Sequence, residues 1–107
     1  MKIDQYSIVI VNLDPTNGSE NKKTRPCVVI SPNEMNHNLR TIVIAPITTA
    51  KKDYPTRIKI DNDDGNGMVV IDQIRTIDIQ RILKVIGMIT THEVKEVKRI
   101  IEETYVK

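Results

Sequence analysis

Aromatic residues are scarce in this sequence. Its 107 residues include no Phe and no Trp, and the three aromatics are all Tyr. The core must therefore be built mainly from Ile and Val, which favour β-strands. Hydrophobic residues still make up 39% of the chain, an ordinary share that argues against disorder. A chain of this length is expected to form a single domain, residues 1–107.

Cysteine and long apolar runs are also scarce. The single Cys27 excludes an internal disulfide and a cysteine-based metal cluster, and its apolar surroundings are typical of a small core residue. No apolar run approaches about 18 residues, so no transmembrane helix is predicted. Residues 1–6 are too polar and too short for a secretion signal. We therefore expect a cytoplasmic protein.

Charge is nearly balanced, with a formal net charge of +2. This value is compatible with a nucleic-acid partner but does not require one, so the positions of the charges matter more than their sum.

Short runs rich in β-branched residues predict five or six strands, mostly antiparallel. The predicted strands are 6–11, 27–30, 41–47, 57–60, 68–74 and 82–89. Pro46 predicts an edge or a bulge and Gly87 a bulge, because proline lacks the ladder N–H and glycine tolerates the local distortion. Residues 33–38 are expected to form a polar turn or one short helical turn, 61–67 a polar turn, and 75–81 a connector. Strands this short and frequent favour a small barrel.

The last segment changes to a helical period. Thr90 and Glu93 have the spacing of a capping box. Four apolar residues then share one face of an amphipathic helix: Val94, Val97, Ile101 and Tyr105. The fold class is therefore mainly β with α, a small barrel closed by a C-terminal helix.

Polar residues stand at three points where strands meet loops. Arg25 precedes the second strand with Glu20 in the same loop, Thr48 follows the third strand, and Asp72 and Gln73 end the fifth. Taken separately, these are ordinary loop or strand-end residues. An arginine at the mouth of a buried strand can, however, grip a phosphate with two parallel hydrogen bonds.

Several sequence blocks occur together in a particular order. They are NLDPTNGSE at 12–20, TRPCVVISP at 24–32, IAPITT at 44–49 with Tyr54 and Pro55, VVIDQIRTID at 69–78, and the helix EVKEVKRII at 93–101. In this order and spacing the chain resembles the MazF/PemK/Kid family of toxin endoribonucleases, from about residue 6 to 101. The resemblance implies an SH3-like antiparallel barrel that works as a homodimer. It also implies metal-independent, cofactor-free cleavage of single-stranded RNA at short sequences, and inhibition by a partner antitoxin.

The resemblance assigns catalytic roles position by position. Arg25 and Thr48 match the main catalytic pair of the family, Glu20 a carboxylate proposed as base in some members, and Asp72 the base of others. The family members that use this aspartate as base also carry an arginine two residues before it. This chain has Val70 at that position, so Arg25 is expected to contribute more to catalysis than Asp72. The general base is left open between Glu20 and Asp72, with water as a third acceptor of the proton.

RNA cleavage of this kind needs few protein groups, because the ribose 2′-OH is the nucleophile. The products expected are a 2′,3′-cyclic phosphate and a 5′-hydroxyl. A guanidinium stays protonated and suits charge stabilisation rather than proton abstraction. Candidate RNA-binding residues are the basic Lys22, Lys23, Lys51 and Lys52, the aromatic Tyr54, which either stacks a base or packs on Pro55, and the polar Asn17, Ser19, Asn36 and Gln73.

Two other functions fit a small barrel. One is a non-enzymatic toxin resembling CcdB, which binds DNA gyrase, although that kind lacks the RP and DQIRTID blocks found here. The other is a nucleic-acid-binding barrel without activity. Cleavage of RNA separates both from the endoribonuclease.

Overall fold

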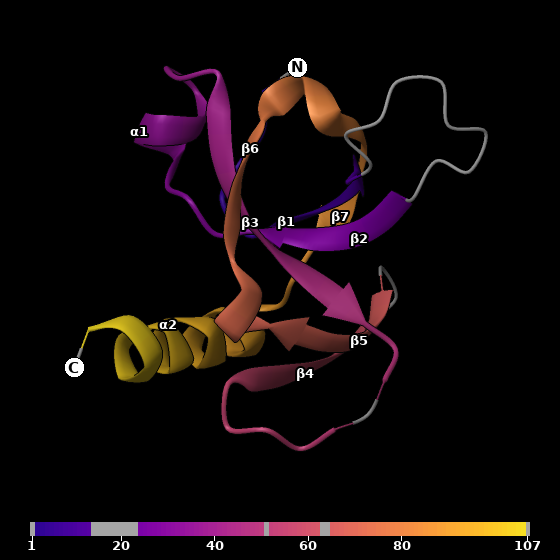
Figure 1. Cartoon of the computed structure of the whole chain (residues 1–107), viewed down its shortest axis with the longest axis vertical. Coiled ribbons are helices and arrows are strands. Elements are labelled where there is room, and N and C mark those ends of the chain that lie inside the picture. The colour runs from indigo at the N-terminus through magenta and orange to yellow at the C-terminus, as the bar shows by residue number, and fades with distance from the viewer. Residues whose placement is uncertain (1, 14–23, 51, 63–64, 107) are drawn as a thin grey trace.

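A bent antiparallel sheet with one long helix forms the body of the protein (Figure 1). The computed structural model describes residues 2–13, 24–50, 52–62 and 65–106. The strands are β1 Ser7–Asn12, β2 Thr24–Val29, β3 Thr41–Thr48, β4 Arg57–Asn62, β5 Gly65–Val70, β6 Arg75–Asp78 and β7 Ile82–Met88. The helices are α1 Asn33–Asn36 and α2 Thr91–Tyr105, with 3₁₀ turns η1 Ile71–Gln73 and η2 Ile79–Arg81. No helix in these ranges has the length and apolar character needed to cross a membrane.

β3 organises the sheet because it pairs with three other strands, β2, β5 and β6. The strand order is β4-β5-β3-β2-β1-β7, and β6 also pairs with β3. The first half of β3 pairs with β6 and its last two residues pair with β5. All pairings are antiparallel, and among the described strands none joins β4 to β7. The predicted fold class, mainly β with a C-terminal helix, is confirmed, and the barrel is an open one.

The two irregularities predicted from proline and glycine are both present. Pro46 lies where β3 has left β6 and has not yet reached β5, so on that side the strand is locally an edge. In the β1–β7 ladder, Ile8 pairs with Gly87 but Val9 pairs with Val85, so Ile86 is an extra residue and forms a bulge.

Two predicted boundaries were wrong, and both affect the candidate site. The strand expected over 68–74 ends at Val70, and Ile71–Gln73 forms a 3₁₀ turn that carries Asp72 and Gln73. Residues 75–81, expected to be a connector, contain β6 and η2, which brings the strands to seven. β6 was missed because Ile77 is its only buried residue, which leaves almost no apolar alternation to detect.

The core has two parts, one on each face of the sheet. The first packs against α2 and contains Ile8, Val28, Ala45, Ile47, Ile58, Ile60, Val69, Ile71, Ile89, Val97 and Ile100. The second lies on the opposite face and contains Ile3, Val9, Val11, Cys27, Val29, Ile42, Ile44, Ile77 and Ile82. Alternate residues of β1, β2 and β3 contribute to alternate clusters, as the pleat requires. The prediction of an Ile/Val core containing Cys27 is confirmed.

Helix α2 is tied to the sheet at both ends. Its capping box is formed as predicted, with Thr90 Oγ1 accepting from Glu93 N and Glu93 Oε1 accepting from Thr90 N. Glu93 Oε2 also accepts a hydrogen bond from Asp61 N at 3.1 Å, which anchors β4. Near the other end, Tyr105 Oη donates to the carbonyl of Ile71 in η1 at 2.7 Å. The predicted helix face omitted Ile100, which is buried, whereas Ile101 is only half-buried.

Candidate active site

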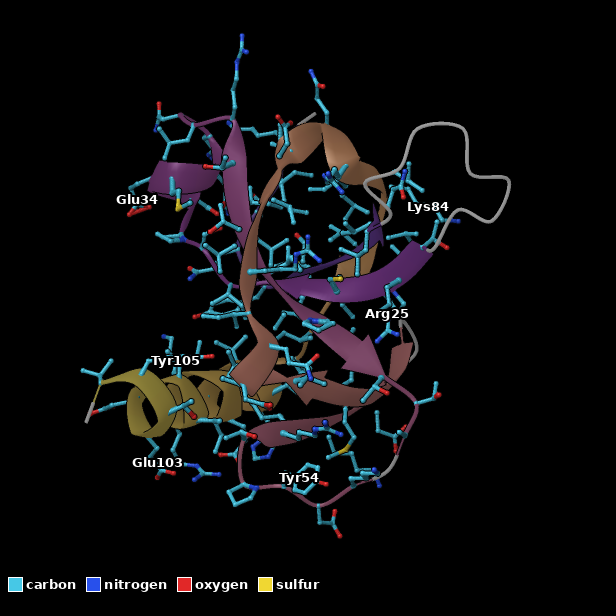
Figure 2. All side chains as sticks on the ribbon, viewed as in Figure 1. Arg25, Glu34, Tyr54, Lys84, Glu103 and Tyr105 are labelled. Carbon is cyan, nitrogen blue, oxygen red and sulfur yellow. The ribbon has the colours of Figure 1, made fainter. Side chains whose placement is uncertain are left out.

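Arg25 and Thr48 line one pocket at the meeting point of β2 and β3. The pocket has a volume of about 230 Å³ and is lined by Arg25, Pro26, Ile47, Thr48 and Thr49. Figure 2 shows Arg25 beside the C-terminal end of β3. The structure therefore brings together the two residues to which the sequence assigned the main catalytic role.

Strand register explains why these two side chains meet. The β2–β3 ladder ends at the pair Cys27 and Pro46, and the same antiparallel register continued by two residues sets Arg25 opposite Thr48. On its other side Arg25 pairs with Val11 of β1, which belongs to the second core cluster. Arg25 thus lies on the same face of β2 as the buried Cys27, two residues nearer the start of the strand, and its side chain is exposed.

The guanidinium of Arg25 is available for an anion. Among the residues that the structure describes, its side chain makes no hydrogen bond and no ion pair. Its backbone carbonyl is 3.6 Å from the Sγ of Cys27, so the thiol lies just beneath the pocket. Burial raises the pKa of the Cys27 thiol to about 12, and the charges of Arg25 and Arg75 only partly oppose this. Cys27 therefore stays protonated at neutral pH and is not a nucleophile.

Thr48 is held in place by its own loop and by the neighbouring strand. Its Oγ1 accepts a hydrogen bond from Ala50 N at 3.2 Å, which leaves the hydroxyl proton free to be donated. In β5, Met68 pairs with Thr48, and Gly67 lies against the Thr48 carbonyl. The hydroxyl is half-buried at the pocket wall.

Asp72 lies in the 3₁₀ turn that follows β5, the strand paired with Thr48. Its Oδ1 accepts a hydrogen bond from Thr56 Oγ1 at 2.8 Å, and the residue is exposed. The carboxylate is thus oriented by a side chain from the loop before β4 and stays open to solvent. Gln73, also a predicted RNA-binding residue, is exposed in the same turn.

Tyr54 contacts a residue that the sequence analysis did not single out. The guanidinium carbon of Arg57 lies over the Tyr54 ring, 4.8 Å from its centroid. The ring is 51% exposed, so its remaining surface is open to a ligand. Lys52, two residues earlier, is exposed on the same loop. Sequence alone gave Arg57 only as the polar position of an alternating strand, with no sign of its contact to Tyr54.

Residues 4–105 match a family model described as the PemK-like, MazF-like toxin of type II toxin–antitoxin system. The chain belongs to this family. It is 34% identical over 74 residues to the endoribonuclease toxin MazF of Escherichia coli K12, an alignment that covers 69% of this chain and 67% of that protein. It is 29% identical over 101 residues to the endoribonuclease MazF of Staphylococcus saprophyticus, covering 89% and 84% of the two chains.

Solved MazF structures share the fold. MazF from Deinococcus radiodurans superposes with a TM-score of 0.83 at 24% identity, covering 100% of this chain and 99% of that one. A mycobacterial endoribonuclease in complex with its cognate antitoxin gives a TM-score of 0.83 at 18% identity, covering 94% and 92%. The family resemblance and the fold predicted from the sequence blocks are both confirmed.

One RNA-binding prediction does not fit this MazF-like structure. Asn36 was expected to read base edges, but it is only 2% exposed. Its Nδ2 donates to the Ser31 carbonyl at 2.8 Å, its Oδ1 accepts from Ser31 Oγ, and Ser31 Oγ accepts from Val43 N at 2.9 Å. The Asn36 side chain therefore fastens α1 to β3 and has no donor facing outward. Sequence reasoning failed here because a polar turn residue can be buried when its own backbone neighbours satisfy it.

The remaining predicted site residues lie outside the described part of the chain. They are Asn17, Ser19, Glu20, Lys22, Lys23 and Lys51.

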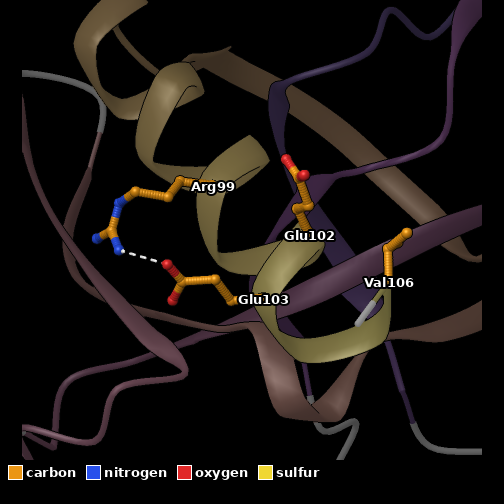
Figure 3. Close-up of a pocket in the computed structure, with 4 residues that line it drawn as sticks. All are labelled: Arg99, Glu102, Glu103 and Val106. Carbon is orange, nitrogen blue, oxygen red and sulfur yellow. Dashed lines mark hydrogen bonds and ion pairs between the residues drawn. The ribbon is translucent and has the colours of Figure 1, made fainter.

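A second hollow in this MazF-family fold, of about 590 Å³, lies along the last turns of α2 (Figure 3). It is lined by Arg99, Glu102, Glu103 and Val106. Arg99 is already paired there, at 3.0 Å to Glu96 and 3.4 Å to Glu103, and its hydrogen bond lowers the pKa of the Glu96 carboxyl. Because Arg99 is already paired with two carboxylates and Glu102 adds a further negative charge, this hollow offers less to an anionic substrate than the Arg25 pocket.

Proposed function

We propose that this MazF-family chain is an endoribonuclease that cleaves single-stranded RNA at a short sequence, without a metal ion. The ribose 2′-OH attacks the adjacent phosphate, which yields a 2′,3′-cyclic phosphate and a 5′-hydroxyl. The observation that carries the proposal is that one pocket holds the Thr48 hydroxyl and the Arg25 guanidinium, which no other described residue engages. Similarity to relatives named endoribonuclease MazF supports the same reaction.

Each pocket residue has a role that suits its chemistry. Arg25 stabilises the extra negative charge of the phosphorane and contacts the departing 5′-oxygen, because its donors are fixed and permanently charged. Thr48 donates its hydroxyl proton to a non-bridging phosphate oxygen. The proton of the 2′-OH is taken by Asp72 or by Glu20, which lies outside the described residues. The hydrogen bond from Thr56 orients the Asp72 carboxylate for this task.

Binding extends beyond the pocket. Lys52, Tyr54 and Gln73 are exposed and are proposed to contact the RNA, together with Asn17, Ser19, Lys22, Lys23 and Lys51. An antitoxin is the second proposed partner, since solved relatives are described as complexes with a cognate antitoxin or with MazE. Its acidic segment would occupy the same pocket and exclude RNA, with an affinity that falls as salt rises. The chain is proposed to work as a homodimer, with a solution mass near twice 12.2 kDa.

The direct test is cleavage of a single-stranded RNA in excess chelator by the wild type and by Arg25→Ala. Loss of one electrostatic donor should lower kcat by about 10²- to 10³-fold. Arg40→Ala is the matched control, because Arg40 is an exposed arginine at the opposite end of β3. Unchanged cleavage by folded Arg25→Ala would refute the assignment. Inhibition of gyrase supercoiling without RNA cleavage would instead support the CcdB-like alternative.

The products and the base are tested separately. A substrate with one 2′-deoxyribose at the cut site should resist cleavage, and the 5′ ends formed should accept phosphate from a kinase without prior phosphatase treatment. Sequencing of these ends gives the recognition sequence. Asp72→Asn and Glu20→Gln are then compared, and the variant that loses about 10²- to 10⁴-fold in rate and the acidic limb of the pH profile identifies the base.

A further inference from the structure

Arg57 is a partly buried arginine that has no counter-charge among the residues the structure describes. Its Nε is covered and has no hydrogen-bond partner, and among the described residues no carboxylate lies within ion-pair distance of its guanidinium. Its guanidinium instead stacks on the Tyr54 ring. Buried polar groups are nearly always hydrogen-bonded, and buried charges are nearly always paired. An arginine held by an aromatic ring, with its donors unspent, is suited to bind an anion.

Strand register places Arg57 on the same face as the catalytic pocket. In the β4–β5 ladder Arg57 pairs with Val70 and Lys59 pairs with Met68, and Met68 in turn pairs with Thr48 of β3. Residues directly opposite one another share a face, and residues two apart along a strand share it too. The intervening residues Ile47, Ile58 and Val69 pack in the α2 cluster on the other face. Arg57 and Thr48 therefore both project from the face turned away from α2.

The distance between these positions suits a single bound strand of RNA. Lys59 lies in line with Thr48 across the sheet, on the far side of β5, and Arg57 is two residues from Lys59 along β4. Two strand spacings and two residues correspond to about 12 Å between the backbones of Arg57 and Thr48. The residue before Arg57, Thr56, holds the Asp72 carboxylate at 2.8 Å. Arg57 thus lies next in sequence to the residue that holds the candidate base, and outside the Arg25 pocket.

We propose that Arg57 is a second phosphate-binding residue, which takes a phosphate next to the scissile one. The terminal nitrogens of the guanidinium donate to the phosphate oxygens, and Tyr54 holds the guanidinium plane in position for them. Arg57 thereby fixes the register of the RNA over Arg25 and Thr48. This inference rests on the proposed ribonuclease function and adds a subsite to it.

The test is the salt dependence of RNA binding. An uncleavable RNA with 2′-O-methyl ribose is bound at several salt concentrations to the wild type, Arg57→Gln and Arg57→Lys. Removing one cationic partner from a single-strand phosphate lowers the slope of log K against log salt by about 0.7. Arg57→Gln should show that decrease and bind several-fold more weakly, whereas Arg57→Lys should keep the slope. Arg40→Gln removes the same charge at the far end of β3 and should match the wild type.

The outcomes separate this inference from the proposed function. A wild type that binds and cleaves RNA while Arg57→Gln keeps the full salt slope overturns the subsite and leaves the ribonuclease intact. A wild type that neither binds nor cleaves RNA overturns both. Arg57→Met, which retains the stem that packs near Tyr54, provides a second neutral variant if Arg57→Gln does not fold. In cleavage assays both neutral variants should raise KM more than they lower kcat, because the phosphate they bind is remote from the reacting atoms.

Discussion

Gly67 lies so close to the backbone of Thr48 that no side chain fits between them. A Cβ on Gly67 would lie 2.6 Å from the Thr48 carbonyl oxygen and 2.9 Å from Cγ2 of Ile47. Gly67 also has a φ of +145°, which other residues rarely adopt. The position of the Thr48 hydroxyl therefore depends on a glycine in the next strand.

Gly67→Ala should lower the rate of RNA cleavage more than the addition of one methyl group would suggest. The added methyl group must displace Thr48 relative to Arg25, and a displacement of about 1 Å in a catalytic group costs on the order of 10²-fold in rate. The strained φ should also lower the free energy of unfolding by about 1–3 kcal/mol. Both are measured on one preparation, by RNA cleavage and by urea unfolding.

Met68→Leu is the matched control for Gly67→Ala, since it changes the adjacent residue at nearly constant volume and should cost less than about 1.5 kcal/mol. A folded Gly67→Ala protein with wild-type cleavage would show that Thr48 does not need this support.

Asn36→Ala should separate a structural asparagine from an RNA-reading one. Its loss leaves Ser31 groups unpaired in the interior, which should lower the free energy of unfolding by about 1–3 kcal/mol. Cleavage per folded molecule and the recognition sequence should stay the same, as measured below the thermal midpoint. A changed cleavage sequence with unchanged stability would restore the original prediction for Asn36.

The Cys27 thiol should make stability depend on alkaline pH. Its pKa is raised from 9.0 to about 12 in the folded protein, so the folded state keeps a proton that the unfolded state loses. The stabilisation is fully present below about pH 9 and disappears as the pH rises toward 12. Urea unfolding at pH 8 and pH 10 should show a decline that is smaller in Cys27→Ala. An equal decline in both proteins would contradict it.

Glu93 should contribute more to stability than its neighbours on α2. It is 7% exposed and accepts hydrogen bonds from Thr90 N and Asp61 N, so Glu93→Ala loses the helix cap and frees the end of β4. We expect a loss of about 1–3 kcal/mol in the free energy of unfolding. Glu96→Ala, which breaks an exposed ion pair with Arg99, should leave the free energy of unfolding almost unchanged, because solvent screens that pair. Equal effects would contradict the structural role of Glu93.

The strands, and the proximity of Arg25 to Thr48, could be predicted from sequence, for different reasons. Runs of Ile and Val marked every strand except β6, where Ile77 alone is buried. Arg25 and Thr48 were predicted from family blocks, and the structure supplies the physical cause, a β2–β3 register in which Cys27 pairs with Pro46. Asn36 could not be classified, because nothing local distinguishes a buried asparagine from an exposed one.

Arg57 shows what sequence could not provide. The family resemblance drew attention to Val70, because some family members carry an arginine at that position. It did not indicate whether another arginine of this chain takes the place of the missing one. The β4–β5 register places Arg57 directly beside Val70. That neighbour depends on where the hairpin turns, and a seven-residue turn predicted over 61–67 left the register open. Placing the end of β4 at Asn62 and the start of β5 at Gly65 would have revealed the pair.

The pairing of β1 with β7 bears on how a newly made chain acquires its activity. The two strands are separated by most of the sequence, and contacts between such distant segments form slowly during folding. Arg25 and Thr48 are synthesised early, yet β1, the support beneath Arg25, has only one neighbour until residues 82–88 dock. Under the proposed ribonuclease function, a growing polypeptide would therefore contain Arg25 and Thr48 for some time before the sheet that supports them is complete and RNA can be cleaved.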